Sequence, residues 1–138
     1  MSCFINPVQP DLCVYLTYEG DCSMIEIMST RYEAGALLAA KRWHRMVVDI
    51  TSLRSRFAAL ELFDFARSLS ADLPESVRIA LVARSDQAKQ ARLIERIARN
   101  GGLALAFFLD VEAATIWVTG MNPHGRIKPQ LAGNPVKL

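Results

Sequence analysis

The sequence predicts a single α/β domain in which helices pack against a mostly parallel sheet of four to five strands. Short apolar runs rich in β-branched and aromatic residues alternate along the chain with longer segments of helical periodicity. Strands that alternate with helices form parallel sheets through right-handed crossovers. The chain has 138 residues, 51% of them hydrophobic, which is enough for one domain with a buried core.

Most of the predicted strands are short apolar runs bounded by polar or glycine-containing segments. Four segments of this kind are residues 12–18, 45–50, 77–83 and 103–109. Residues 3–5 are a fifth candidate, as a short edge strand, because Pro7 and Pro10 follow and proline is tolerated at sheet edges and in turns. Residues 51–56 read as a polar loop with two arginines.

The predicted helices have apolar residues at spacings of three and four. They are residues 22–42, 57–73, about 86–100 and 111–118. Asp21 or Ser23 is expected to cap the first helix and Ser85 or Asp86 the third, because short polar side chains accept hydrogen bonds from the free N–H groups of a first turn. Residues 24–28 also alternate enough to be a strand, which leaves the start of the first helix open.

The last part of the chain differs from the rest. Residues 121–138 contain several prolines and glycines and lack periodicity, so they are predicted to be a flexible C-terminal tail. The α/β domain is therefore expected to span residues 1–120.

Charge and cysteine content exclude several classes of protein. The formal net charge of +2 is too small to predict nucleic-acid binding. No basic segment followed by an apolar run opens the chain, and no apolar stretch is long enough to span a bilayer. Cys3, Cys13 and Cys22 are widely spaced and have no histidine nearby, so we expect reduced thiols in a cytoplasmic protein, with no metal site and no cofactor.

Four segments of the chain carry a resemblance to a known family. They are residues 14–20 (VYLTYEG), 46–50 (MVVDI), 78–82 (RIALV) and 106–117 (AFFLDVEAATIW). In this order they resemble the SpoIIAA-like branch of the STAS superfamily, whose members include anti-sigma factor antagonists. The resemblance implies a STAS-like α/β fold over about residues 12–118. It also implies a regulatory role through protein binding, since the best-understood members are phosphorylation-controlled partners of kinase-type anti-sigma factors.

The phosphorylation switch of that family is not matched. Its phosphorylated serine lies at the start of the helix that follows the aspartate-ending strand, and the matching segment here is residues 56–60 (RFAAL). That segment has no hydroxyl group, so the usual switch is expected to be absent. Ser52 and Ser55 are the nearest hydroxyls, and both precede it.

One candidate binding site lies where the strands are expected to end. Ligands of open parallel sheets bind beyond the carboxyl ends of the strands, and helix N-termini favour anions. The residues offered by two of these loops are Ser52, Arg54, Ser55, Arg84 and Ser85. The alternative is structural: Ser55, Ser85 and Asp110 cap helices and the arginines are solvated.

A second candidate is a basic stripe on one helix. Its members lie three or four positions apart and share a face: Lys89, Arg92, Arg96 and Arg99. Such a row suits an acidic partner, anionic lipid or RNA, although it is also what a solvated helix face looks like.

Catalysis is not predicted. A nucleophile needs a base within hydrogen-bond reach. His44 lies in a basic cluster before a strand, and His124 lies in the predicted tail. No phosphate loop, nucleophile elbow or dinucleotide fingerprint is present.

The large aromatic residues are a further candidate for a ligand-binding site. Six large ones are expected to be mainly core, with a lipid cavity as the alternative: Phe57, Phe63, Phe65, Phe107, Phe108 and Trp117. Trp43, among basic residues, is expected to be the most exposed aromatic.

The leading interpretation is a non-catalytic module that recognises a protein partner or an anionic or apolar ligand. A small lipid- or hydrophobic-ligand carrier is the alternative, and exposed edge strands are compatible with a homodimer.

Overall fold

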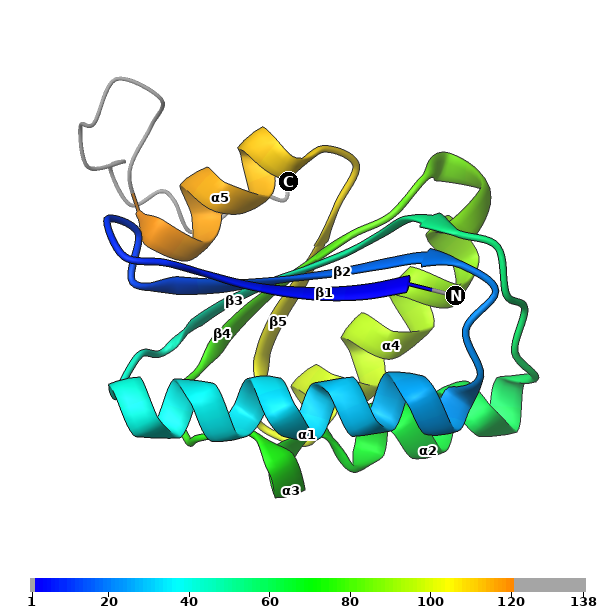
Figure 1. The fold of residues 1–138 in the computed structure, drawn as a ribbon. Coiled ribbons are helices and arrows are strands. Elements are labelled where there is room, and N and C mark those ends of the chain that lie inside the picture. The colour runs from blue at the N-terminus through cyan, green and yellow to red at the C-terminus, as the bar shows by residue number, and fades with distance from the viewer. Residues whose placement is uncertain (1, 121–138) are drawn as a thin grey trace.

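A computed structural model describes residues 2–120 of the chain (Figure 1). The segment predicted to be a tail, residues 121–138, lies outside the described residues. Five strands form one sheet in the order β1-β2-β3-β4-β5. Their bounds are β1 (Ser2–Val8), β2 (Cys13–Gly20), β3 (Arg45–Leu53), β4 (Arg78–Val82) and β5 (Ala104–Phe108). β1 is antiparallel to β2 and the other neighbours are parallel, which confirms the predicted α/β class.

The helices cover both faces of this sheet unequally. Their bounds are α1 (Met24–Lys41), α2 (Ala59–Arg67), α3 (Leu69–Asp72), α4 (Ala88–Asn100) and α5 (Val111–Thr119), with a short 3-10 helix η1 (Ser85–Gln87). Figure 1 shows α1 to α4 on one side of the sheet and α5 on the other. The main core therefore lies between the sheet and α1 to α4.

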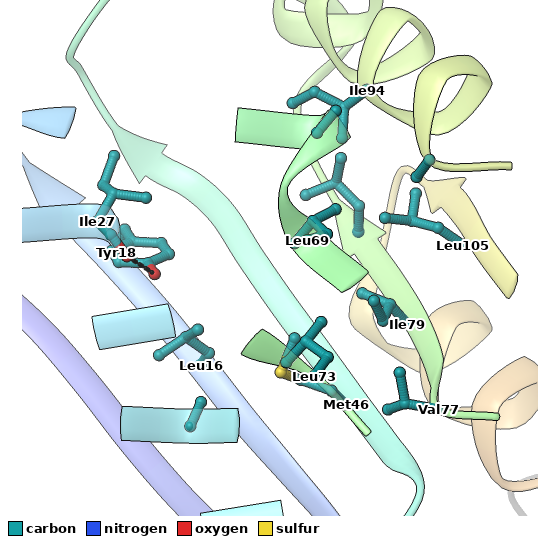
Figure 2. Packing of buried hydrophobic residues seen from close by; sticks show 14 of the residues in the cluster. Leu16, Tyr18, Ile27, Met46, Leu69, Leu73, Val77, Ile79, Ile94 and Leu105 are labelled. Carbon is teal, nitrogen blue, oxygen red and sulfur yellow. Dashed lines mark hydrogen bonds between the residues drawn. The ribbon is translucent and has the colours of Figure 1, made fainter. Parts of the chain in front are cut away.

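Alternation along the strands divides the core into two parts, because successive side chains point to opposite faces of a sheet. In β3, Met46 faces α1 to α4 and the next residue, Val47, belongs to the smaller cluster under α5. Figure 2 shows Met46, Ile79 and Leu105, from three neighbouring strands, in the larger cluster. On the opposite face, Ala114 and other α5 residues pack on Val47 and its neighbours.

The first helix begins at a capping box. The backbone N–H of Glu26 donates to Ser23 Oγ at 3.1 Å, and Ser23 N–H donates to Glu26 Oε1 at 2.7 Å. Two free N–H groups of the helix start are thereby satisfied. Of the two predicted caps it is Ser23 that serves, and residues 24–28 are helical throughout.

The strands β1 and β3 extend beyond their predicted ranges. β1 is longer than residues 3–5. β3 continues to Leu53, because the register of β2 against β3 shifts after Thr17 and lets Ser52 pair with Glu19. Residues 51–53 are therefore strand and not loop. In each case pairing with a neighbouring strand, which local sequence does not encode, lengthens the element.

The predicted helix over residues 57–73 begins at Ala59 and is interrupted at Ser68. Arg31 of α1 explains the interruption, because its Nη1 donates to the Phe65 carbonyl at 2.9 Å and its Nη2 to the Ser68 carbonyl at 3.3 Å. The side chain of Arg31 therefore binds two carbonyls at this break.

The expectation for Trp43 was also wrong: its side chain is 8% exposed and is covered by the Lys41 ammonium, 4.9 Å from the ring centroid.

Candidate functional site

A pocket of about 140 Å³ lies at the carboxyl ends of β3 and β4, between the sheet and the helices α1, α2 and α4. Its interior is mainly apolar. Side chains that define it come from β2, β3, α2, β4 and β5: Tyr18, Val48, Leu62, Phe65, Ile79 and Leu105. Figure 2 shows Tyr18, Ile79 and Leu105 in this layer, with Ile94 of α4 above them. The sheet therefore forms the floor of the pocket and the helices its roof.

The mouth of the pocket is polar and rich in arginine. Arg54 and Arg56, from the β3–α2 loop, line it together with Arg84, which follows β4. Ser55 lines it as well. The structure thus brings three of the five predicted anion-site residues to one place. Ser52 and Ser85 are exposed and do not line the pocket.

Arg84 is held by the end of β3. Its Nη1 donates to the carbonyl of Thr51 and, at 3.4 Å, to that of Leu53, while its Nε lies 2.8 Å from Asp86 Oδ1. Gln87 adds a bond from Nε2 to the Ile50 carbonyl at 2.9 Å. These contacts satisfy carbonyls that would otherwise be unpaired where β3 leaves the sheet. The role of Arg84 is therefore to join the β4–α4 turn to β3.

Ser55 joins two loops. Its Oγ accepts a hydrogen bond from the Cys22 N–H at 2.6 Å and donates one to the Cys22 carbonyl at 2.8 Å. The alternative expectation that Ser55 caps a helix was wrong, because α2 begins four residues later, at Ala59. Instead, Ser55 holds the β3–α2 loop against the β2–α1 loop.

The expected cap of α4 was also wrong. Ser85 and Asp86 lie inside the short helix η1, and Gln87 precedes α4 without a side-chain cap. The Gln87 side chain acts at the start of η1 instead, where its Oε1 accepts a hydrogen bond from the Arg84 N–H at 2.8 Å. Asp110 does cap α5, with its Oδ1 2.7 Å from the Ala113 nitrogen.

The three arginines at the mouth are not equally engaged. Arg54 lies 3.3 Å from Asp21 Oδ2, but both side chains are more than 70% exposed, so this ion pair is weak. Arg56 has no hydrogen bond or ion pair within residues 2–120. The pKa of Asp86 is held below its usual value, chiefly by the hydrogen bond from Arg84, with smaller contributions from the charges of Arg84 and Arg56. Arg56 is thus the least engaged cation. It was not among the site residues predicted from the sequence, although it adjoins Ser55.

The basic stripe lies on the outer side of α4. All four side chains are exposed, while Ala91, Ile94 and Ala98 face the core. Two of the four also contact β5: the Arg92 guanidinium lies 5.4 Å from the Phe107 ring centroid, and Arg99 Nε donates to the Leu105 carbonyl at 2.7 Å. A ligand for Lys89, Arg92, Arg96 and Arg99 stays a prediction.

The six aromatic residues are not fully buried. Five of them are half-buried, and Phe63 is exposed. Phe57 and Phe65 line the pocket, whereas Phe108 of β5 contacts Trp117 of α5 in a tilted arrangement with ring centroids 5.6 Å apart. The aromatic side chains therefore divide between the pocket, the second face of the sheet and the surface.

His44 and Cys13 both lie outside the pocket lining. His44 is exposed, with Nδ1 3.3 Å from Ser76 Oγ, at the amino end of β3 and away from the pocket. Burial raises the pKa of the Cys13 thiol to about 12, so it stays protonated at neutral pH. Residues 2–120 contain no group of three metal-ligating side chains. Across the same residues, no helix is both long and apolar enough to cross a bilayer.

Comparison with known proteins places the fold. No protein-family model matches the chain, and no curated protein matches it. A crystal structure of an anti-sigma factor antagonist from Mycobacterium paratuberculosis superposes with a TM-score of 0.59 at 14% identity, over 85% of this chain and 92% of that one. A DUF3478-family protein from Shewanella loihica with a SpoIIAA-like fold superposes with a TM-score of 0.55 at 19% identity, over the same shares.

This chain has a SpoIIAA-like fold. Both comparisons confirm the resemblance predicted from the sequence, and at these identities they concern the fold alone. In this SpoIIAA-like domain, residues 56–60 form the entry to α2 and contain no hydroxyl group. The same segment contributes Arg56 and Phe57 to the pocket.

Proposed function

We propose that this SpoIIAA-like domain is a non-catalytic regulatory module that recognises a protein partner with the outer face of α2 and the loop before it. The observation that carries the proposal is the exposure of apolar side chains on α2. Leu60 is 69% exposed and Phe63 is 42% exposed. Residues three positions apart lie on the same side of a helix, so these two side chains form one apolar surface.

The residues around this surface suit a protein interface. The Arg67 guanidinium lies 5.6 Å from the Phe63 ring centroid, and Arg56 lies in the loop that precedes the helix. Aromatic and arginine side chains are enriched at the centres of interfaces, where they contribute most of the binding energy. We call the surface formed by Arg56, Leu60, Phe63 and Arg67 the α2 face.

The structural relatives support a regulatory role of this kind. One of them is named an anti-sigma factor antagonist, which is a protein that acts on another protein. The α2 face follows β3, at the position where the resemblance implies the phosphorylated serine of the family. Because residues 56–60 offer no phosphate acceptor, we propose that recognition here is not switched by phosphorylation in that segment.

The alternative function, a lipid carrier, fits the pocket less well. Its volume of about 140 Å³ is close to the 150 Å³ or so of an engineered apolar cavity that holds benzene. A long acyl chain does not fit in this space. The pocket therefore favours a module over a carrier of long-chain lipids.

Site-specific cross-linking tests the proposed partner surface. A photo-crosslinking phenylalanine analogue is placed at position 60, and at position 32 as the control, because Tyr32 is exposed on α1 at 66% and lies outside the α2 face. We expect a protein adduct from position 60 and none from position 32 in cells that naturally express the chain.

The partner identified by mass spectrometry is then purified and titrated. We expect Leu60→Asp to weaken binding by about 30-fold, the effect of losing an interface residue worth about 2 kcal/mol. Tyr32→Asp is expected to leave binding unchanged. Equal affinities for the wild type and Leu60→Asp would show that the partner docks elsewhere.

A further inference from the structure

We propose that the pocket under α2 is a binding site for a small organic anion, whose apolar part is about the size of one aromatic ring or a short branched chain. The proposal concerns the inside of the domain; it shares Arg56 with the α2 face but uses neither Leu60 nor Phe63. It follows from three properties of the pocket: its size, the polarity of its walls and the charge at its mouth.

The size sets the class of ligand. Protein interiors are close-packed, and voids much larger than a water molecule are few. The pocket holds about 140 Å³, which is roughly the space of a single ring such as benzene. The pocket is open at its mouth, so without a ligand its apolar lining is exposed to water, which is unfavourable. A ligand with an apolar part of this size covers that lining.

The walls require that the buried part of the ligand be apolar. Floor and roof are formed by aliphatic and aromatic side chains such as Leu62, Ile79 and Leu105. The hydroxyl of Tyr18 lies among them, but it already donates to the Ile27 carbonyl at 3.1 Å, as the dashed line in Figure 2 marks. A polar group placed in this interior would lose its hydrogen bonds to water without replacement.

The arginines at the mouth favour a ligand with a negatively charged group. Arg54, Arg56 and Arg84 all line it, and Asp86 is the acidic residue among the lining side chains. Asp86 is already paired with Arg84 at 2.8 Å. Arg56 has no hydrogen bond or ion pair within the described part of the chain. An anion at the mouth would therefore meet a guanidinium that is ready to donate, and charge-assisted hydrogen bonds of this kind are strong.

The loop that carries Arg56 is held in place independently of a ligand. Ser55 bonds both backbone groups of Cys22, and Arg84 and Gln87 hold the end of β3 from which the loop leaves. The cation is thus fixed near the apolar space before binding. Such pre-organisation lowers the entropy that binding costs.

Phenylacetate is the probe for this site, because it joins one ring to one carboxylate. Binding is followed by the methyl resonances of Ile79, Leu81 and Leu105 in the purified chain. We expect these resonances to shift and saturate with a dissociation constant of about 1 mM, as a ligand with few atoms allows. Acetate, which lacks the ring, is expected to leave them unchanged.

Two comparisons separate the charge from the cavity. Arg56→Gln is expected to weaken phenylacetate binding about threefold to fivefold, as loss of an exposed ionic contact does, and to leave the neutral phenylacetamide unaffected. Arg67→Gln, on α2 but outside the pocket lining, is the matched control and is expected to change neither. Val48→Phe fills the cavity from β3 and is expected to abolish binding of both molecules.

The outcomes that overturn the proposal are distinct. No shift of the pocket methyls at about 10 mM phenylacetate means that the site does not take a ring-sized anion. If phenylacetate and phenylacetamide bind with equal affinity, and Arg56→Gln changes neither affinity, then the site does not select for a negative charge. Shifts that persist in a folded Val48→Phe variant place binding elsewhere. None of these results bears on the cross-linking at position 60, so the two proposals fail separately.

Discussion

Arg31 of α1 is buried against Asp72 of α3, with Nε and Nη2 of the guanidinium both 2.7 Å from Asp72 Oδ2. The Arg31 side chain is only 3% exposed. It also lies over the Phe65 ring, 5.1 Å from the centroid, and donates to the carbonyls of Phe65 and Ser68. One side chain therefore fastens α1 to the segment that carries both the pocket roof and the α2 face.

Removing the charge of Asp72 is predicted to destabilise the domain. Asp72→Asn keeps the shape but leaves the buried guanidinium without its counter-charge. We expect the free energy of unfolding in urea to fall by about 3 kcal/mol, because breaking a buried pair leaves an uncompensated charge. Ser70→Ala, at an exposed position of the same short helix, is the control and is expected to change stability by less than about 0.5 kcal/mol. A small effect of Asp72→Asn would mean that the hydrogen bonds to Phe65 and Ser68 are enough to hold Arg31.

Gly35 is predicted to be required for the close approach of α1 to α3. A Cβ atom at this position would lie 2.1 Å from the Asp72 carbonyl oxygen, which is a backbone atom that cannot rotate away. Gly35→Ala is therefore expected to cost about 1–3 kcal/mol of stability through overlap, although alanine favours helix by up to about 1 kcal/mol over glycine.

The neighbouring position supplies the comparison for Gly35. Ala36 is exposed, so Ala36→Ser changes helix propensity by only a few tenths of a kcal/mol. Both variants are compared with the wild type by thermal unfolding. A stabilised Gly35→Ala would show that α3 moves freely away from α1.

The order of strands and helices could be predicted from the sequence because it depends on local periodicity. The β3 and β4 segments are short apolar runs, and α4 has a clear apolar stripe. The extension of β3 to Leu53 could not be predicted in this way, since it depends on pairing with the end of β2. The break at Ser68 likewise depends on Arg31, 37 residues away in the chain.

A signal for Arg31 is nevertheless present in the sequence. Ile27, Arg31, Ala34 and Leu38 follow one another at spacings of three and four, so Arg31 lies within the apolar stripe of α1. A charged residue in such a stripe needs a buried partner. Which partner it finds depends on the tertiary structure, and Asp72 comes from a short helix that the sequence analysis joined to α2.

The candidate site was predictable in part. Parallel strands end at the same edge of a sheet, which is why Arg54, Ser55 and Arg84 meet. Ser52 and Ser85 were expected with them, but strand alternation and the turn of η1 leave both exposed. The apolar pocket itself arises from the packing of helices on the sheet, which no local pattern encodes.

Ser55 and Ser52 provide a matched test of this distinction. Ser55→Ala removes both hydrogen bonds to the backbone of Cys22, which is expected to cost about 1–3 kcal/mol because buried groups are left unsatisfied. Amide exchange at Cys22 should accelerate. Ser52→Ala alters an exposed hydroxyl and should leave stability within about 0.5 kcal/mol of the wild type. Equal effects of the two substitutions would contradict the structural role of Ser55.

Alkaline pH is predicted to destabilise the domain through buried acidic groups. Burial raises the pKa of Cys13 from 9.0 to about 12, and it raises the pKa of Tyr18 as well. Between pH 9 and 12 the unfolded chain loses the Cys13 proton while the folded chain keeps it. The unfolded state then binds fewer protons, so stability falls as pH rises through this window, by about 1.4 kcal/mol per pH unit for each such group. Below pH 9 the thiol is protonated in both states and contributes no pH dependence.

Cys13→Ala isolates this contribution. Urea unfolding of the wild type and the variant is measured at about pH 8 and about pH 10.5, where the linkage of Cys13 is respectively absent and well developed. We expect the variant to be less stable at the lower pH, because it loses buried volume, but to lose less stability between the two pH values than the wild type does. The comparison uses each protein's own change with pH, so the packing defect cancels. Identical losses in the two proteins would mean that the Cys13 thiol ionises as readily in the folded domain as in the unfolded chain.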